Sequence, residues 1–177
     1  MFDFIVEYIK KPTQIGTFLP CFGGLVDSVI SNIDFSNDLT ILEFGPGNGN
    51  FTKKILRKAT QKSCLYSFEI NEKFYENCQN IEDERLVLVN DSAENISKYI
   101  DKKVDVIISG VPLSALDKKL RMKIIENSYN FLRKDGKFIQ YQYFSSAYSD
   151  LKLFFPSIQK YRVYFHLPPA IYYFGQK

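Results

Sequence analysis

The strongest constraint on the fold is an alternation of short apolar runs with segments of helical periodicity. Near-continuous apolar runs indicate parallel strands that are covered on both faces. The predicted strands span Thr40–Phe44, Cys64–Ile70, Arg85–Asn90, Val104–Ser109 and Gly136–Tyr143. The predicted helices between them span Phe51–Lys58, Glu72–Asn80, Ala93–Ile100 and Leu116–Leu132. This order is expected of right-handed βαβ units, so the sequence predicts a doubly wound, Rossmann-like α/β sheet.

The carboxyl-terminal segment predicts an antiparallel ending to this sheet. A short helical stretch near residues 146–155 precedes two β-rich runs, Ser157–Leu167 and Ala170–Phe174. Pro168-Pro169 joins them and is too short for a parallel crossover, so the two runs are expected to form an antiparallel hairpin. The sheet is then seven-stranded.

The amino-terminal segment is expected to be helical. Apolar residues recur at helical spacing within Phe2–Ile9 and again within Phe22–Ile30. A chain of 177 residues lies within the usual size of one domain. We therefore expect a single domain over residues 1–177, with residues 1–36 as a helical prefix and residues 37–177 as the core.

Composition argues against membrane-spanning and metal-binding classes. No apolar run approaches the roughly 18 to 20 residues that span a bilayer, and Asp3 and Glu7 interrupt the stretch where a signal peptide would be apolar. The three cysteines form no CxxC pair and His166 is the only histidine, so we expect neither a disulfide framework nor a metal site. A cytoplasmic protein is expected.

Charge is unevenly placed along the chain. Residues 1–50 carry 2 basic and 6 acidic side chains, whereas residues 101–177 carry 13 and 6. This asymmetry suits an anionic partner such as nucleic acid or a lipid surface. Lysines on solvated helix faces are the commoner explanation, and we apply it to the cluster of Lys118, Lys119, Arg121 and Lys123.

A glycine-rich loop follows the first predicted strand. Gly45, Gly47 and Gly49 give the spacing GxGxG, which lets the backbone turn tightly and lie close to a ligand. A dinucleotide-binding fold would instead show GxGxxG. Glu43, two residues before the first glycine, fits the methyltransferase form of this loop, in which the carboxylate faces the amino-acid part of S-adenosylmethionine.

Two further carboxylates follow the next two predicted strands. Glu69 lies where it can accept hydrogen bonds from two ribose hydroxyls, and Asp91 where it can accept from an adenine amino group. A helix amino cap is the alternative role for Asp91. The expected residues of an S-adenosylmethionine site are Glu43, Phe44, Gly45, Pro46, Gly47, Asn48, Gly49, Glu69, Ile70, Asp91, Ser92 and Ser109.

The turn after the fourth predicted strand should meet the methyl acceptor. Methyltransferases that act on adenine carry an Asn or Asp followed by Pro-Pro-Tyr or a close variant here, whereas this chain has Ser109 and Leu113. The missing amide or carboxylate argues against a flipped base as substrate. The candidate catalytic residues are Ser109, Gly110 and Tyr141, with Ser109 or Tyr141 as the acceptor of a proton from an amine.

Several segments together resemble the bacterial phospholipid N-methyltransferases. They are Lys10–Pro20, Glu43–Thr52, Ser109–Leu113, Phe138–Tyr141 and Leu167–Ala170. That family is related to the ribosomal RNA adenine dimethylases in its core. The departures are Asn48 and Val111, where the family more often has Thr and Leu.

The resemblance implies stepwise methylation of phosphatidylethanolamine with S-adenosylmethionine as cofactor. It also implies an amino-terminal amphipathic helix on the inner face of the membrane, although packing of Phe2–Ile9 on the sheet is the alternative. Methyl transfer to RNA or to a soluble amine, and a non-catalytic cofactor-binding module, are the other hypotheses. Nucleic acid is disfavoured as a partner because of Ser109 and because a carboxyl-terminal helical domain is lacking. No obligate protein partner is inferred.

Aromatic residues near the expected acceptor site offer cation–π contacts to a methylated ammonium. Tyr141, Tyr143 and Tyr148 lie at or just beyond the end of the fifth predicted strand, and Tyr8 and Phe18 belong to the prefix. With 12 Tyr and 16 Phe in the chain, a place in the core is the competing explanation for each of them.

Overall fold

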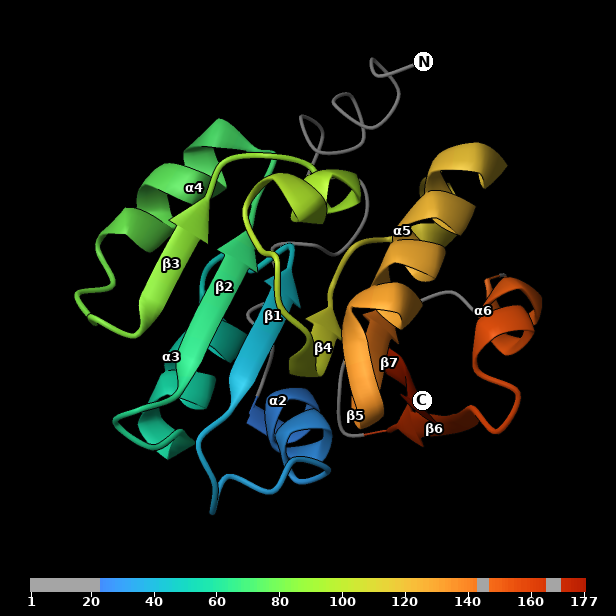
Figure 1. Ribbon diagram of the computed structural model, residues 1–177, viewed down its shortest axis with the longest axis horizontal. Coiled ribbons are helices and arrows are strands. Elements are labelled where there is room, and N and C mark those ends of the chain that lie inside the picture. The colour runs from blue at the N-terminus through green and yellow to red at the C-terminus, as the bar shows by residue number, and fades with distance from the viewer. Residues whose placement is uncertain (1–22, 143–146, 165–169) are drawn as a thin grey trace.

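The computed structural model describes residues 23–142, 147–164 and 170–177 (Figure 1). The strands are β1 (Thr40–Phe44), β2 (Cys64–Phe68), β3 (Leu86–Val89), β4 (Val104–Ser109), β5 (Leu132–Gln142), β6 (Gln159–Val163) and β7 (Ala170–Gln176). The α-helices are α2 (Gly23–Ile30), α3 (Asn50–Lys58), α4 (Glu72–Gln79), α5 (Lys118–Phe131) and α6 (Tyr148–Phe154). Two short 3-10 helices are η1 (Ala93–Lys98) and η2 (Leu113–Ala115).

The strands form one seven-stranded sheet in the order β3-β2-β1-β4-β5-β7-β6. Strands β1 to β5 pair in parallel, whereas β7 is antiparallel to both β5 and β6. The predicted doubly wound sheet and its antiparallel ending are therefore confirmed. The chain reverses its direction of winding between β1 and β4, and in open α/β sheets the ligand crevice opens at the carboxyl ends of the strands beside such a point.

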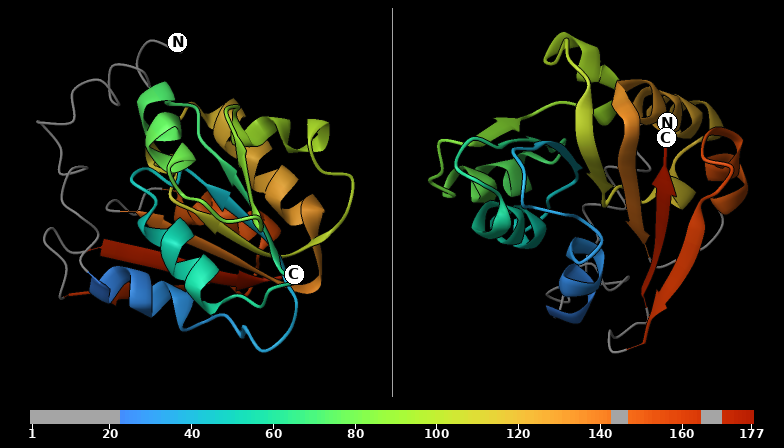
Figure 2. Two further views of the ribbon diagram at one scale, coloured as in Figure 1. Left: turned by 90° about the vertical axis from the view of Figure 1, so that its left-hand side faces the viewer. Right: turned by 60° about the horizontal axis from the view of Figure 1, so that its bottom comes forward.

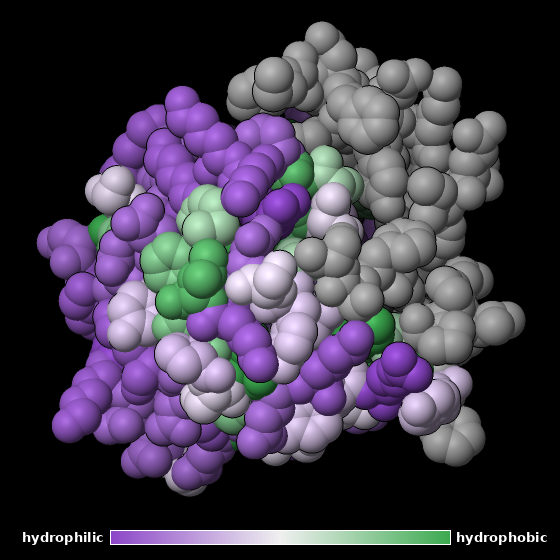
Figure 3. All heavy atoms as spheres, turned by 90° about the vertical axis from the view of Figure 1, so that its right-hand side faces the viewer, coloured by the Kyte–Doolittle hydropathy of each residue, from purple (hydrophilic) through white to green (hydrophobic). Residues whose placement is uncertain are grey.

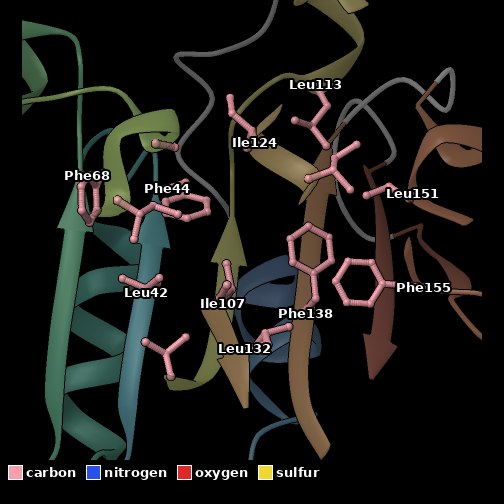
Figure 4. Close-up of a cluster of buried hydrophobic side chains, with 14 of the residues drawn as sticks. Leu42, Phe44, Phe68, Ile107, Leu113, Ile124, Leu132, Phe138, Leu151 and Phe155 are labelled. Carbon is pink, nitrogen blue, oxygen red and sulfur yellow. The ribbon is translucent and has the colours of Figure 1, made fainter. Parts of the chain in front are cut away.

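Helices cover both faces of the sheet (Figure 2). One buried cluster joins η1, α5 and α6 to the sheet, and Figure 4 shows part of it, including Phe138 beside Phe155. The other joins α2 and α3 to the opposite face. Side chains of successive strand residues point alternately into these two clusters, which explains why the strand sequences are apolar throughout.

The surface on the side of α5 and α6 is mostly hydrophilic over the part that the structure describes, with smaller hydrophobic areas between the hydrophilic side chains (Figure 3). Leu153 of α6 is the most exposed aliphatic side chain there, at 69%. No described helix is long and apolar enough to cross a bilayer.

Most predicted elements differ from the structure only in their end residues, and two differ more. The expected α-helix over Ala93–Ile100 is instead the 3-10 helix η1, with non-helical dihedral angles at Asn95. The Asn95 side chain donates to the Asp91 carboxylate (2.7 Å), and such local side-chain bonds compete with a regular helix. Strand β5 begins at Leu132 rather than Gly136, because a register shift against β4 accommodates Asp135 at a φ of 63°.

Several predictions on the amino-terminal prefix lie outside the described residues. These are the helix over Phe2–Ile9 and the placements of Tyr8 and Phe18. Tyr143 also lies outside them, whereas Tyr148 stacks on Tyr173 in the core, with ring centroids 5.4 Å apart.

Phe155 gives a direct test of how the carboxyl-terminal elements are held. It is fully buried, stacks on Phe138 at 4.8 Å and meets Tyr129 edge-on at 5.4 Å. Phe155→Ala should lower the free energy of unfolding by about 3 to 5 kcal/mol, because it leaves a cavity in the core. Urea denaturation measures the loss, with Leu153→Ala, exposed and nearby, expected within about 0.5 kcal/mol of wild type. Similar losses in both variants would contradict this packing.

Candidate functional site

The glycine loop begins at the end of β1 and runs into α3. Gly45, Gly47 and Gly49 have φ angles of 70°, 56° and 74°, in the left-handed region that favours glycine. The Gly45 amide donates to the Phe68 carbonyl of β2 at 2.8 Å, which fixes the start of the loop to the sheet. A Cβ added at Gly47 would meet no atom of the described residues within 4 Å, so among these residues space lies open beside the middle of the loop.

Glu43 lies beneath this loop and is 1% exposed. Its Oε2 accepts hydrogen bonds from Thr52 Oγ1 of α3 and Ser67 Oγ of β2, both at 2.7 Å. Its Oε1 is buried and has no hydrogen-bond partner among the described residues. Burial raises the pKa of this carboxyl to about 7, against the effect of the two hydroxyl donors. Oε1 of Glu43 can therefore accept a hydrogen bond from a ligand, and a positively charged group beside it would favour the ionised form of the carboxyl.

Glu69 lies one residue beyond β2 and is also buried, at 6% exposure. Its carboxylate accepts from the Asn71 amide at 2.9 Å and from the Gly47 amide at 3.3 Å, so it joins the glycine loop to the start of α4. Burial raises its pKa, although these amide donors act in the opposite direction. The Asn90 side chain in turn donates to the Glu69 carbonyl at 2.8 Å. Ile70 follows with a 47% exposed side chain.

Asp91 lies after β3, and both oxygens of its carboxylate accept hydrogen bonds from neighbouring residues. Its Oδ1 accepts from the Ser92 amide at 2.6 Å and from the Asn95 side chain, and its Oδ2 accepts from the Tyr99 hydroxyl at 2.9 Å. The Asn95 bond is the main cause of a lowered Asp91 pKa. The amino cap of η1 is Ser92, so the alternative role of Asp91 as that cap is wrong. Each carboxylate oxygen has two lone pairs, so the group retains capacity for a ligand.

The structure does not bring the three candidate catalytic groups together on one face of the sheet. Ser109 follows Ile108, which packs against the α2 and α3 side, so its side chain points to the opposite side, where Oγ is buried without a described partner. Tyr141 instead stacks on Phe51 of α3, with centroids 4.3 Å apart. A Cβ at Gly110 would lie 2.2 Å from the Tyr141 hydroxyl oxygen, so this phenol occupies the side-chain position of residue 110.

Sequence reasoning did not assign site roles to Thr52, Ser67 or Gln140. Ser67 and Gln140 are polar residues inside apolar strand runs, which is a usable signal, because a polar side chain buried in a sheet needs a polar partner. Both are fully buried. The described residues hold no group of three or more His, Cys, Asp and Glu side chains suited to a metal ion.

The site fits a ligand that carries a positive charge and hydroxyl groups. Among the described residues, Glu43 has a buried acceptor atom without a partner and the loop has open space at Gly47, and carboxylates lie at the ends of the next two strands. Residues 41–136, more than half of the chain, match the family model described as a methyltransferase domain. The chain belongs to this methyltransferase family.

Solved structures with low sequence identity share the methyltransferase fold. A precorrin-6y C5,15-methyltransferase from Geobacter metallireducens has a TM-score of 0.75 at 12% identity, with 92% of this chain and 93% of that chain covered. The N-methyltransferase NodS from Bradyrhizobium japonicum, in complex with S-adenosylhomocysteine, has a TM-score of 0.71 at 13% identity, with 86% and 83% covered. An rRNA methylase from Streptococcus thermophilus has a TM-score of 0.65 at 16% identity, with 91% and 99% covered.

Membership of this methyltransferase family sets aside the hypothesis of a non-catalytic binding module.

The raised pKa of Glu43 makes the stability of the methyltransferase depend on pH. A carboxyl whose pKa is higher in the folded state adds stability below its unfolded value of 4.5 and loses it as the pH rises through about 7. Between these limits the wild type should lose up to about 3 kcal/mol more than Glu43→Gln, which does not titrate. Urea denaturation across this pH range measures both proteins. Parallel pH profiles would contradict the buried, titrating carboxyl.

Proposed function

We propose that S-adenosylmethionine binds at the carboxyl ends of β1 to β4. The residues that would hold it are Glu43, Phe44, Gly45, Pro46, Gly47, Asn48, Gly49, Glu69, Ile70, Asp91, Ser92 and Ser109. Glu43 would meet the charged amino-acid part, and Glu69 and Asp91 would accept from the ribose hydroxyls and the adenine amino group. Three features of the part of the chain that the structure describes support this arrangement: the space at Gly47, the Oε1 of Glu43 without a partner there, and the exposed side chain of Ile70.

We propose further that the methyl acceptor is the amine head group of a phospholipid such as phosphatidylethanolamine. The observation that carries this proposal is the Tyr141 hydroxyl at the side-chain position of Gly110. The turn after β4 therefore presents a phenol and backbone groups there, rather than the amide or carboxylate typical of enzymes that methylate adenine. The near end-to-end resemblance to phospholipid N-methyltransferases agrees with this acceptor.

The chain's own residues mainly have to orient and deprotonate the amine. When bound, the cofactor supplies a methyl group on a sulfonium centre, which a lone pair must approach in line at about 3 to 3.5 Å. A primary amine has a pKa near that of Lys, about 10, so it must first lose a proton to water or a nearby acceptor. Tyr141, on the side of α3, is the candidate acceptor in its phenolate form, which would take up the proton and become the neutral phenol. Its ring suits a methylated ammonium, at about 0.5 to 2 kcal/mol per contact.

The basic carboxyl-terminal part of the chain supports peripheral attachment to an anionic membrane surface. Residues 101–177 carry 13 basic and 6 acidic side chains. Basic side chains near an anionic lipid surface contribute about 1 kcal/mol each.

Incubation with labelled S-adenosylmethionine tests the acceptor. Three acceptors are compared: vesicles of phosphatidylethanolamine with an anionic phospholipid, soluble phosphoethanolamine, and total RNA. We expect label in mono-, di- and trimethylated lipid on chromatography, and little in the other two. Vesicles of phosphatidylcholine with the same anionic lipid are the matched control, because their amine is already fully methylated. Label in RNA or phosphoethanolamine but not in lipid would overturn the proposed acceptor.

A further inference from the structure

Gln140 is a fully buried amide at the junction of β4, β5 and β7. In the sheet register it lies opposite Ser109 on β4 and Tyr173 on β7, close to the carboxyl ends of the parallel strands. Its neighbours along β5, Phe138 and Ile139, are apolar and equally buried. A polar side chain in this position needs a specific partner.

The partner is the turn that follows β4. Gln140 Nε2 donates to the Val111 carbonyl and to the Tyr141 carbonyl, both at 2.9 Å. Carbonyl oxygens only accept hydrogen bonds, so this chemistry fixes which end of the amide faces them. The Val111 carbonyl also accepts from the Leu113 amide at 2.7 Å, and Leu113 is anchored in the core at 0% exposure. Gln140 thus joins β5 to the middle of the Ser109–Leu113 turn.

The oxygen of the same amide is less favourably placed. Gln140 Oε1 is buried and has no described hydrogen-bond partner. A buried polar atom without a partner opposes folding, and this cost offsets the stabilisation from the two hydrogen bonds of Nε2, so the amide adds little net stability to the sheet. Stability of the fold therefore does not explain the amide, whereas control of the turn does.

We propose that Gln140 is a positioning residue for methyl transfer, which holds the Val111 carbonyl so that the Ser109–Leu113 turn keeps a fixed shape against the acceptor. The proposal rests on the proposed function in that this turn borders the methyl acceptor. On the opposite side of the turn, the Tyr141 hydroxyl lies against Gly110, so adjacent residues of β5 restrain the turn from both faces of the sheet. A misplacement of about 1 Å can lower a transfer rate by about a hundredfold.

The main test is Gln140→Met, which keeps the length of the side chain but removes both donors. We expect an unfolding curve close to that of the wild type, because the lost hydrogen bonds and the removed unpartnered oxygen act in opposite directions, and a cofactor Kd within about twofold. Hydrogen exchange should be faster in residues 110–116 but not in β1 or β2, because the turn loses its hydrogen bond from β5. The turnover rate should fall at least tenfold. Turnover within twofold of the wild type would overturn the proposal.

Gln140→Glu provides a second test, in which the pH dependence of turnover is measured. A merely structural role of Gln140 would not produce this dependence. In its protonated form the carboxyl can donate one hydrogen bond to the Val111 carbonyl, whereas the ionised form sets a negative charge against two carbonyl oxygens. The ratio of variant to wild-type turnover should therefore fall as the pH rises. A ratio that does not change with pH would contradict the proposal, even if Gln140→Met proves unstable.

The assay separates this inference from the identity of the acceptor. Total transfer of label into a whole cell extract is measured for each protein, and the extract is then divided into lipid, RNA and small-molecule fractions. The fraction that the wild type labels tests the proposed acceptor. The ratio of variant to wild-type transfer tests Gln140, whichever fraction carries the label. No transfer by the wild type into any fraction would overturn both proposals.

Discussion

Burial of the Glu43 carboxyl beneath the glycine loop is the interaction on which the site depends. One oxygen receives hydrogen bonds from Thr52 of α3 and Ser67 of β2, so a single side chain joins β1, β2 and the helix that follows the loop. The other oxygen is left without a described partner. Desolvation makes the ionised form costly, and the pKa of about 7 reflects this cost. A bound cation would offset it, which links the fold of the loop to the ligand that it binds.

Backbone hydrogen bonds just beyond the strand ends hold the functional residues along the same edge of the sheet. The Gly45 amide donates to the Phe68 carbonyl, the Glu69 amide to the Val89 carbonyl, and the Gly110 amide to the Phe44 carbonyl, at 2.7 to 2.9 Å. Each bond continues the parallel ladder one residue past a strand. The loop, the carboxylate of Glu69 and the turn after β4 therefore meet at the same edge of the sheet, beside the point where the winding reverses.

Much of this arrangement is predictable from the sequence, because the signals are local. The apolar runs locate β1 to β4 to within a few residues, the GxGxG spacing locates the loop, and the doubled proline indicates the antiparallel ending. The 3-10 form of η1 is not predictable in this way, since it depends on side-chain bonds around Asp91. The position of the Tyr141 hydroxyl against Gly110 also cannot be predicted from the sequence, because it depends on how β5 packs beside the turn after β4. The sequence likewise does not show that the Ser109 hydroxyl is buried on the face of the sheet opposite Tyr141, because that depends on how the two strands pair.

Calorimetric titration of S-adenosylmethionine into the wild type and Gly47→Asn tests the central claim most directly. Asn is among the few residues that tolerate a positive φ, and a Cβ at position 47 meets no described atom within 4 Å, so the variant should fold. We expect one-to-one binding to the wild type and an affinity at least tenfold weaker for Gly47→Asn, with closely similar unfolding curves. Equal affinities, or no binding to the wild type, would contradict the assignment of this loop to the cofactor.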